Sequence, residues 1–165
     1  MNSVKIVAAM CLISGTTLAE DVPITGTVQS RCIIQTDTAG VYGNPNAYTL
    51  STAPADGGVL PIVRYDVSLA NAYKAKITHP DSFSSSPTLN DTPTFTGSTE
   101  VNAVGDAAMS GYEAAKVTYA NSTEYDLTEA GSTWFKTNSE VVNGGNKAFP
   151  GGTYRAVVQA ECIAQ

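Results

Sequence analysis

The sequence predicts an all-β domain with the architecture of a β-sandwich. Composition is the first reason: the 165 residues include 20 threonines and 14 serines but only 15% charged residues. Such a composition suits strands better than helices. The second reason is that apolar and polar residues alternate with a period of two in several segments, and the third is that turn residues separate these segments. The length allows one domain of ordinary size.

Charge and residue counts exclude several functional classes. The formal net charge is −6, and the chain has one histidine and three cysteines. A negative net charge argues against broad nucleic-acid binding through a basic surface. A single histidine and three cysteines leave little material for a metal cluster. We therefore expect no nucleic-acid partner, no metal and no cofactor.

Residues 1–19 are typical of a secretory signal peptide. Lys5 supplies the positive charge, residues 6–13 form a short apolar stretch, and Ala19 precedes the expected cleavage site. The apolar stretch is too short to span a bilayer, although an uncleaved anchor remains the alternative. We therefore expect an exported chain of 146 residues that begins at Glu20.

The exported chain keeps two cysteines, Cys32 and Cys162. Two cysteines in an exported protein most simply form one disulfide, and the alternative is two free thiols or intermolecular pairs. The Cα atoms of bridged cysteines lie within about 7 Å of each other. The disulfide would therefore hold the end of the chain beside its beginning.

The first exported segment, residues 21–34, alternates over its whole length. Its mostly apolar face is formed by the even positions Val22, Ile24, Gly26, Val28, Ser30, Cys32 and Ile34. This period predicts one long amphipathic strand. A glycine in the middle of a strand marks a bulge or a place where a bulky side chain does not fit, and Gly26 is such a residue.

The middle of the chain predicts further strands. Residues 62–69 and 73–77 alternate on either side of a turn, so we expect them to pair as a hairpin. The other expected elements are a short strand near Tyr48 and Leu50, a long loop with a short strand over residues 82–98, a helical turn over 105–111, and strands over 115–119 and 132–136. The last of these would carry Trp134, the only tryptophan, toward the core.

The last segment, residues 153–165, shows the clearest alternation. The residues that face one way are Tyr154, Ala156, Val158, Ala160, Cys162 and Ala164. Polar side chains face the other way, with Val157 and Ile163 as exceptions. The segment therefore predicts an ordinary core strand.

These features together resemble the subunits of chaperone–usher pili, nearest in look to the colonisation-factor type of fimbrial major subunit. The resemblance rests on an acidic, threonine-rich, exported β domain, on the N-terminal strand with Gly26 at its middle, and on the turn over residues 150–154 that opens the last strand. It covers the exported chain in layout and is closest at the two ends.

The resemblance implies an immunoglobulin-like sandwich that lacks one strand. Residues 20–31 would be a donor-strand extension and residues 32–165 the domain. The donor side chains would be Val22, Ile24, Gly26 and Val28, and the strand flanking the acceptor groove would carry Tyr154, Ala156, Val158 and Ala160. A neighbouring subunit would receive the extension, a form of β-augmentation. Because such a contact is head-to-tail, it generates a filament.

The implied function is that of a structural, non-catalytic subunit of a surface fimbrium that supports adhesion. Its partners would be copies of itself, a periplasmic chaperone, an outer-membrane usher and a host or surface receptor. It would pass through the periplasm during assembly. At 146 residues the exported chain has no room for an additional lectin domain, which favours a shaft or minor subunit.

Other interpretations of the sequence stay open. The alternation of the N-terminal strand is equally compatible with pairing inside its own domain, and a disordered leader is a further alternative. The chain would also suit a monomeric exported immunoglobulin-like binding domain, either an adhesin or a carbohydrate-binding module. A small hydrolase that uses His79 is a third reading, although His79 beside Pro80 and Asp81 predicts a surface turn.

Overall fold

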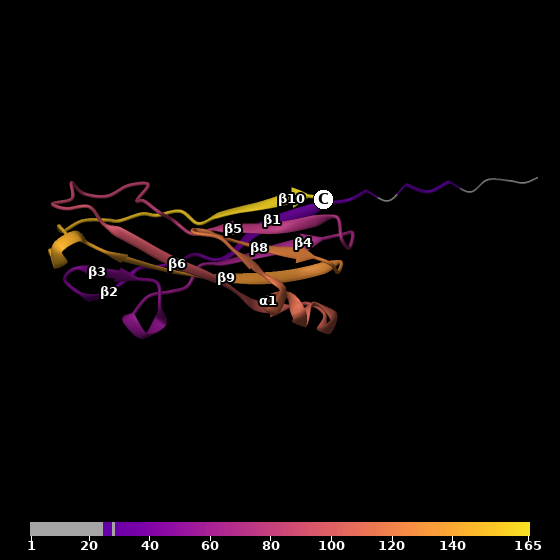
Figure 1. Ribbon diagram of the computed structural model, residues 1–165, viewed down its shortest axis with the longest axis horizontal. Helices are drawn as coiled ribbons and strands as arrows, with labels where there is room; N and C mark the ends of the chain where they lie inside the picture. Colours follow the sequence, from indigo (N-terminus) through magenta and orange to yellow (C-terminus); the bar gives the residue numbers. More distant parts are fainter. Residues whose placement is uncertain (1–24, 28) are drawn as a thin grey trace, which may run out of the picture.

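The structure is a computed structural model that describes residues 25–27 and 29–165. These residues form two antiparallel β-sheets with short helical turns between strands (Figure 1), which confirms the prediction of an all-β sandwich. The expected signal peptide and three of the expected donor residues, Val22, Ile24 and Val28, lie outside the described residues.

The first sheet has the strand order β1-β4-β9-β3-β2, and β6 pairs with the other edge of β9. The long strand β9 is its centre, because β4 and β3 pair with successive parts of one edge while β6 covers the opposite edge. The bounds are β1 (Cys32–Thr38), β2 (Gly43–Asn46), β3 (Thr49–Ser51), β4 (Ile62–Val67), β6 (Thr94–Val104) and β9 (Gly131–Val142).

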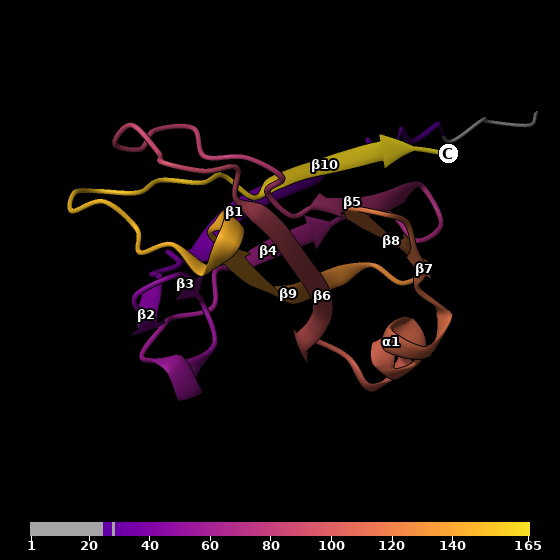
Figure 2. The ribbon, with the colours of Figure 1, turned by 60° about the vertical axis from the view of Figure 1, so that its left-hand side comes forward.

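The second sheet has the order β10-β5-β8-β7, formed by β5 (Tyr73–Thr78), β7 (Val117–Thr118), β8 (Ser122–Leu127) and β10 (Gln159–Ala164). Four helical turns connect the strands: η1 (Pro54–Asp56), η2 (Ala107–Gly111), α1 (Tyr112–Ala115) and η3 (Gly144–Asn146). The expected turn over residues 105–111 is confirmed and continues into α1. Figure 2 shows α1 at one end of the sandwich, near β7 and β8.

The core lies between the two sheets and is built from the inward faces of β4, β5, β8 and β9. Tyr65, Ile77 and Phe135 are completely buried. The ring of Phe135 lies 5.5 Å from that of Tyr65 in its own sheet and 4.4 Å from that of Tyr125 in the other sheet. Aromatic rings at these distances attract one another in addition to the area they bury. Met109 of η2 closes the core near α1.

The expected hairpin between residues 62–69 and 73–77 is wrong in its pairing. Both strands exist, but β4 pairs with β1 and β9 while β5 pairs with β10 and β8. The connection after β4 crosses from one sheet to the other, with Asn71 in a left-handed conformation at φ 58°. Alternation identifies which face of a strand is buried: of the predicted inward residues, Tyr65, Val67, Ala75 and Ile77 are buried, whereas Leu69 is 41% exposed. It does not identify the neighbour with which the strand pairs.

The strands found around residues 82–98 and 115–119 also differ from the expected ones. The loop expected over residues 82–98 gives way at Thr94 to β6, a strand of eleven residues. The strand expected over residues 115–119 shrinks to the two-residue β7, and Val117 is exposed. The neighbouring strand β8 was not predicted, although Tyr125 and Leu127 alternate within it and are buried.

Trp134 does not pack into the core. Side chains alternate along β9, so Phe135 faces inward and Trp134 faces outward. The indole Nε1–H of Trp134 donates to Asp37 Oδ1 at 3.2 Å, and the guanidinium carbon of Arg64 lies 5.1 Å from the ring centroid.

His79 is buried rather than placed in a surface turn, with only 8% of its surface exposed. Its backbone N–H donates to Asn121 O at 3.0 Å, so the chain stays in line with β5 for one more residue. Its ring lies against Gly97 of β6, where a Cβ atom would come within 2.6 Å of the ring. The glycine therefore leaves the space that the histidine fills.

Candidate functional site

A groove of about 790 Å³ runs along one side of the sandwich, and we call it the edge groove. One wall is formed by residues 34–42, which include most of β1. The other wall is formed by residues 152–160, the segment that leads into β10. The floor comes from β3, β4, β9 and the loops beside them, through Leu50, Thr52, Pro61, Ile62, Val63, Thr137 and Ser139.

Each wall ends in the outermost strand of its sheet. In the part of the chain that the structure describes, β1 pairs only with β4, and β10 pairs only with β5. An outermost strand leaves a row of backbone N–H and C=O groups without a neighbouring strand. The edge groove therefore has an unpaired hydrogen-bonding edge on either side.

The C-terminal wall is extended but mostly unpaired, which differs from the single strand expected over residues 153–165. Regular pairing begins only at Gln159, which lies opposite Thr78 of β5. Beyond Thr78 the register reaches His79 and then Pro80. Because proline has no backbone N–H, it ends a ladder. Before β10, the only bridge of this wall joins Arg155 to Ser85.

The alternation expected for this wall is confirmed. Tyr154, Ala156, Val158 and Ala160 are half-buried, whereas the residues between them are exposed. All four line the edge groove, although Ala160 alone lies within β10. Val158 and Ala160 also pack against the hydrophobic core. Ala156, Val158 and Ala160 thus present small apolar side chains that are only partly covered.

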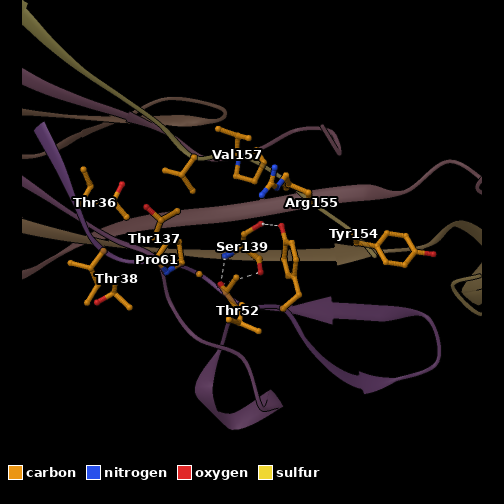
Figure 3. A pocket seen from close by; sticks show the side chains of 18 of the residues that line it. Thr36, Thr38, Thr52, Pro61, Thr137, Ser139, Tyr154, Arg155 and Val157 are labelled. Carbon is orange, nitrogen blue, oxygen red and sulfur yellow. Dashed lines mark hydrogen bonds between the residues drawn. The ribbon is translucent and has the colours of Figure 1, made fainter. Parts of the chain in front are cut away.

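Hydroxyl side chains make up much of the floor (Figure 3). The Tyr42 and Ser139 hydroxyls share a hydrogen bond of 2.9 Å, and the backbone N–H of Ser139 donates to Thr52 Oγ1 at 2.8 Å. Burial raises the pKa of the Tyr42 phenol, and the Ser139 hydrogen bond only partly offsets this effect. Tyr42 is therefore neutral at ordinary pH, and these groups satisfy one another.

Among the described residues that line the edge groove, Arg155 is the only charged one. The lining residues that the structure describes include no carboxylate and no histidine. The partly covered apolar wall and unpaired edges of the groove suit an extended peptide segment, because such a segment adds backbone hydrogen bonds to both edges.

The predicted disulfide is confirmed and joins the two walls at one end. Cys32 is the first residue of β1, Cys162 lies in β10, and their Cα atoms are 6.4 Å apart. At the opposite end, the ring centroid of Tyr154 lies 5.2 Å from those of Phe83 and Phe149, and Phe83 in turn packs against Phe95 at 4.8 Å. This aromatic cluster fixes the beginning of the C-terminal wall.

Of the expected donor residues, the structure describes Gly26 alone. It is exposed, and a Cβ atom placed on it would have no neighbour within 4 Å. The described residues on either side of it are also exposed and belong to no strand. Within the expected strand over residues 21–34, the described residues 25–27 and 29–31 belong to no strand, and β1 begins at Cys32.

The floor of the edge groove was not predicted from the sequence. Thr137 and Ser139 continue the inward face of β9 beyond Phe135, and both are buried. Their period-two spacing was a readable signal of an inward face. The hydroxyls gave no sign that this part of the face lies under a groove, since threonine and serine also occur on exposed faces.

Two further properties concern the described residues as a whole. They contain no group of three or more potential metal-ligating side chains. None of their helices is long and apolar enough to cross a membrane.

Comparisons with known proteins found no match to this chain among family models, curated proteins or solved structures.

Proposed function

We propose that this protein is a structural subunit of a surface pilus, and that its edge groove accepts the N-terminal segment of a neighbouring copy. One observation carries the proposal. Two unpaired sheet edges face each other across a groove whose apolar wall is half-buried. Exposed edges of this kind invite pairing with another chain.

The strand order supports a sandwich of the immunoglobulin type that lacks its last strand. The first sheet contains the run β1-β4-β9-β6, and the second contains β10-β5-β8. A strand placed beside β10 would extend the second sheet and cover the half-buried face of the C-terminal wall. It would also lie next to β1, whose outer edge is free.

The N-terminal extension has a suitable length for this place. The C-terminal wall spans residues 152–160, which at about 3.3 Å per residue is roughly 30 Å. Residues 20–31 reach about 40 Å when extended. Burying Val22, Ile24 and Val28 in the edge groove would contribute roughly 5–8 kcal/mol. The half-buried positions of the wall and the apolar positions of the extension both repeat every second residue, so their side chains can interdigitate.

The two ends of the molecule favour a head-to-tail chain. The described residues before β1 leave beside the C-terminus, at the end where the disulfide lies (Figure 1). The edge groove extends from there toward the other end. An arriving segment and a departing segment therefore occupy different places on one subunit. Such a heterologous contact does not close, and it generates a filament.

A pair of leucine substitutions tests the proposal. Gly26→Leu adds a bulky side chain to the face expected to enter the edge groove, whereas Thr27→Leu adds the same side chain to the opposite face. Exported protein is run unboiled and boiled on a denaturing gel without reductant. We expect a ladder that collapses on boiling for the native chain and Thr27→Leu, and its loss for Gly26→Leu. A single monomer band for the native chain in both lanes would overturn the proposal.

A second candidate is a monomeric exported domain that binds carbohydrate. It is favoured by the outward position of Trp134, whose ring lies beside Asp37 and Arg64. Because Trp134 is the only tryptophan, its fluorescence reports this surface alone. A saturable fluorescence change with simple sugars, together with a single monomer band, would support this candidate over the first.

A further inference from the structure

The disulfide lies at a point where the two walls of the edge groove are too close to admit a strand. Neighbouring strands lie about 4.8 Å apart, so two strands that flank a third are separated by about 9.6 Å. The Cα atoms of Cys32 and Cys162 are only 6.4 Å apart and are covalently joined through their side chains. The first residues that line the edge groove are Ile34 and Ala160, each two positions from a cysteine. The bridge is therefore the closed end of the groove.

The chain's own N-terminal segment starts on the far side of this closed end. Two hydrogen bonds hold Arg31 beside Ser68: the Arg31 N–H donates to Ser68 Oγ at 2.9 Å, and the Ser68 N–H donates to Arg31 O at 3.0 Å. The Ser68 hydroxyl also lies 3.3 Å from the carbonyl oxygen of Gln29. These contacts direct residues 29–31 away from the edge groove.

Entry of this segment into its own groove would therefore require two changes. The hydrogen bonds to Ser68 would have to break, and the chain would have to reverse direction around the Cys32–Cys162 bridge. Arg31 directly precedes the bridged Cys32, so any such loop would have to be formed by residues 29–31, which the contacts with Ser68 hold in place. A segment that arrives from a second copy meets neither obstacle, because it can enter along the open length of the groove.

We propose that the Cys32–Cys162 disulfide, with Ser68 as a positioning residue, prevents the subunit from filling its own groove and so makes strand insertion intermolecular. This inference rests on the proposed function. The role that this inference gives to the disulfide is distinct from stabilisation. It predicts that a longer tether before Cys32 allows the subunit to fill its own groove even when the disulfide is intact.

A tether of six alternating glycines and serines, inserted between Arg31 and Cys32, tests this inference in the full chain. The insertion retains the bridge and gives the N-terminal segment enough length to pass around it. A tethered segment has an effective concentration of millimolar order, so at micromolar protein it should outcompete a neighbour's segment about a thousandfold. We therefore expect the gel ladder of the native chain to be replaced by a monomer with a raised melting temperature.

The control is the same insertion combined with Gly26→Leu. If the monomer forms because its own segment fills the groove, the leucine should remove the rise in melting temperature. Ser68→Ala, which keeps the native tether, should give a smaller increase in monomer. The double variant Cys32→Ser/Cys162→Ser should also shift protein from ladder to monomer, and the insertion variant decides the question if this double variant does not fold.

The outcomes separate the inference from the function on which it rests. A native chain without a ladder overturns the proposed function and the inference together. A native ladder that persists unchanged in the insertion variant overturns only the inference. Replacement of that ladder by a monomer whose raised melting temperature is lost with Gly26→Leu supports both.

Discussion

The two halves of this sandwich follow the same alternating pattern, but their inward-facing side chains are buried to very different degrees. In the half around β4, β5 and β9, the inward residues Tyr65, Ile77 and Phe135 are completely buried. In the half along the edge groove, the inward residues Ala156 and Val158 are only half-buried. Both sets lie on the inward faces of extended segments. What differs is the presence of a neighbouring strand on both sides.

This difference shows that an inward-facing pattern determines orientation, whereas burial depends on how many elements pack over it. We refer to the half around β4, β5 and β9 as the closed half and to the half along the edge groove as the open half. A residue of the closed half has its environment complete within one chain. A half-buried residue of the open half, such as Val158, is expected to reach a similar environment only when another segment lies in the groove.

Alkaline pH should have the largest effect, and it should act through the closed half. Burial raises the pKa values of Tyr65 and Tyr125 far above 10, so both remain neutral in the folded protein. In the unfolded chain they ionise near pH 10. Stability is therefore unaffected by these groups below pH 10 and is lost progressively as the pH rises above it. Tyrosinate absorbance followed alongside circular dichroism should show a component that appears only on unfolding.

Replacing Tyr65 or Tyr125 by phenylalanine provides the control. Either variant should reduce the absorbance component that accompanies unfolding. If the whole tyrosinate signal develops while the circular dichroism remains native, the two phenols are not held neutral by the closed half.

Deleting a large side chain should have the next largest effect, and the two halves should respond differently. Phe135→Ala is expected to lower the free energy of unfolding of the isolated subunit by about 3–5 kcal/mol, because a fully buried ring is removed. Val158→Ala should cost about 1 kcal/mol or less in the isolated subunit, since this side chain is half-buried. Denaturant unfolding measures both values. Equal losses in the two variants would contradict the division into halves.

Two glycines allow the same comparison on a smaller scale. A Cβ atom at Gly97 would lie 2.6 Å from the His79 ring and 2.9 Å from Asn138 O, whereas one at Gly26 would meet nothing within 4 Å. Gly97→Ala should therefore lower the free energy of unfolding by about 1–3 kcal/mol through overpacking. Gly26→Ala should leave the melting temperature of the isolated subunit unchanged. A lower melting temperature for Gly26→Ala would show that this residue packs within its own domain.

The smallest effect is expected outside both halves, at Trp134. Trp134→Phe keeps an aromatic ring beside Arg64 but removes the hydrogen bond to Asp37. The loss should be about 1 kcal/mol or less, because a single hydrogen bond to a half-exposed group contributes little net stability. Unfolding curves of this variant and of Phe135→Ala would then differ clearly, although the two residues are adjacent. Similar losses would contradict the outward orientation of Trp134.

Much of the fold was predictable from the sequence because alternation is a local property. It identified the inward faces of β4 and β5 and of the C-terminal wall, and the cysteine count identified the Cys32–Cys162 pair. Strand pairing was not predictable in this way. The crossing between β4 and β5 depends on which strand edges meet in space. The period-two alternation along a single strand carries no information about its partner strand.

The candidate site was predictable only in part. The half-buried positions of the C-terminal wall follow from alternation, but the end of regular pairing at Thr78 depends on Pro80, whose effect appears only once the register with β10 is known. The sequence around Thr137 and Ser139, which form the floor of the edge groove, does not differ from that of other strand faces that carry hydroxyl side chains. The donor role of residues 20–31 and the function of the chain remain predictions.

The position of the disulfide also bears on how a filament of these subunits would carry tension. A pulling force would enter each subunit through its N-terminal segment, directly before Cys32, and leave through the neighbour's segment held between the two walls. Cys32 belongs to one wall, and the covalent bond to Cys162 connects it to the other. The load would then be divided between both walls at the point of entry. Because β1 and β10 belong to different sheets, both sheets would share this load.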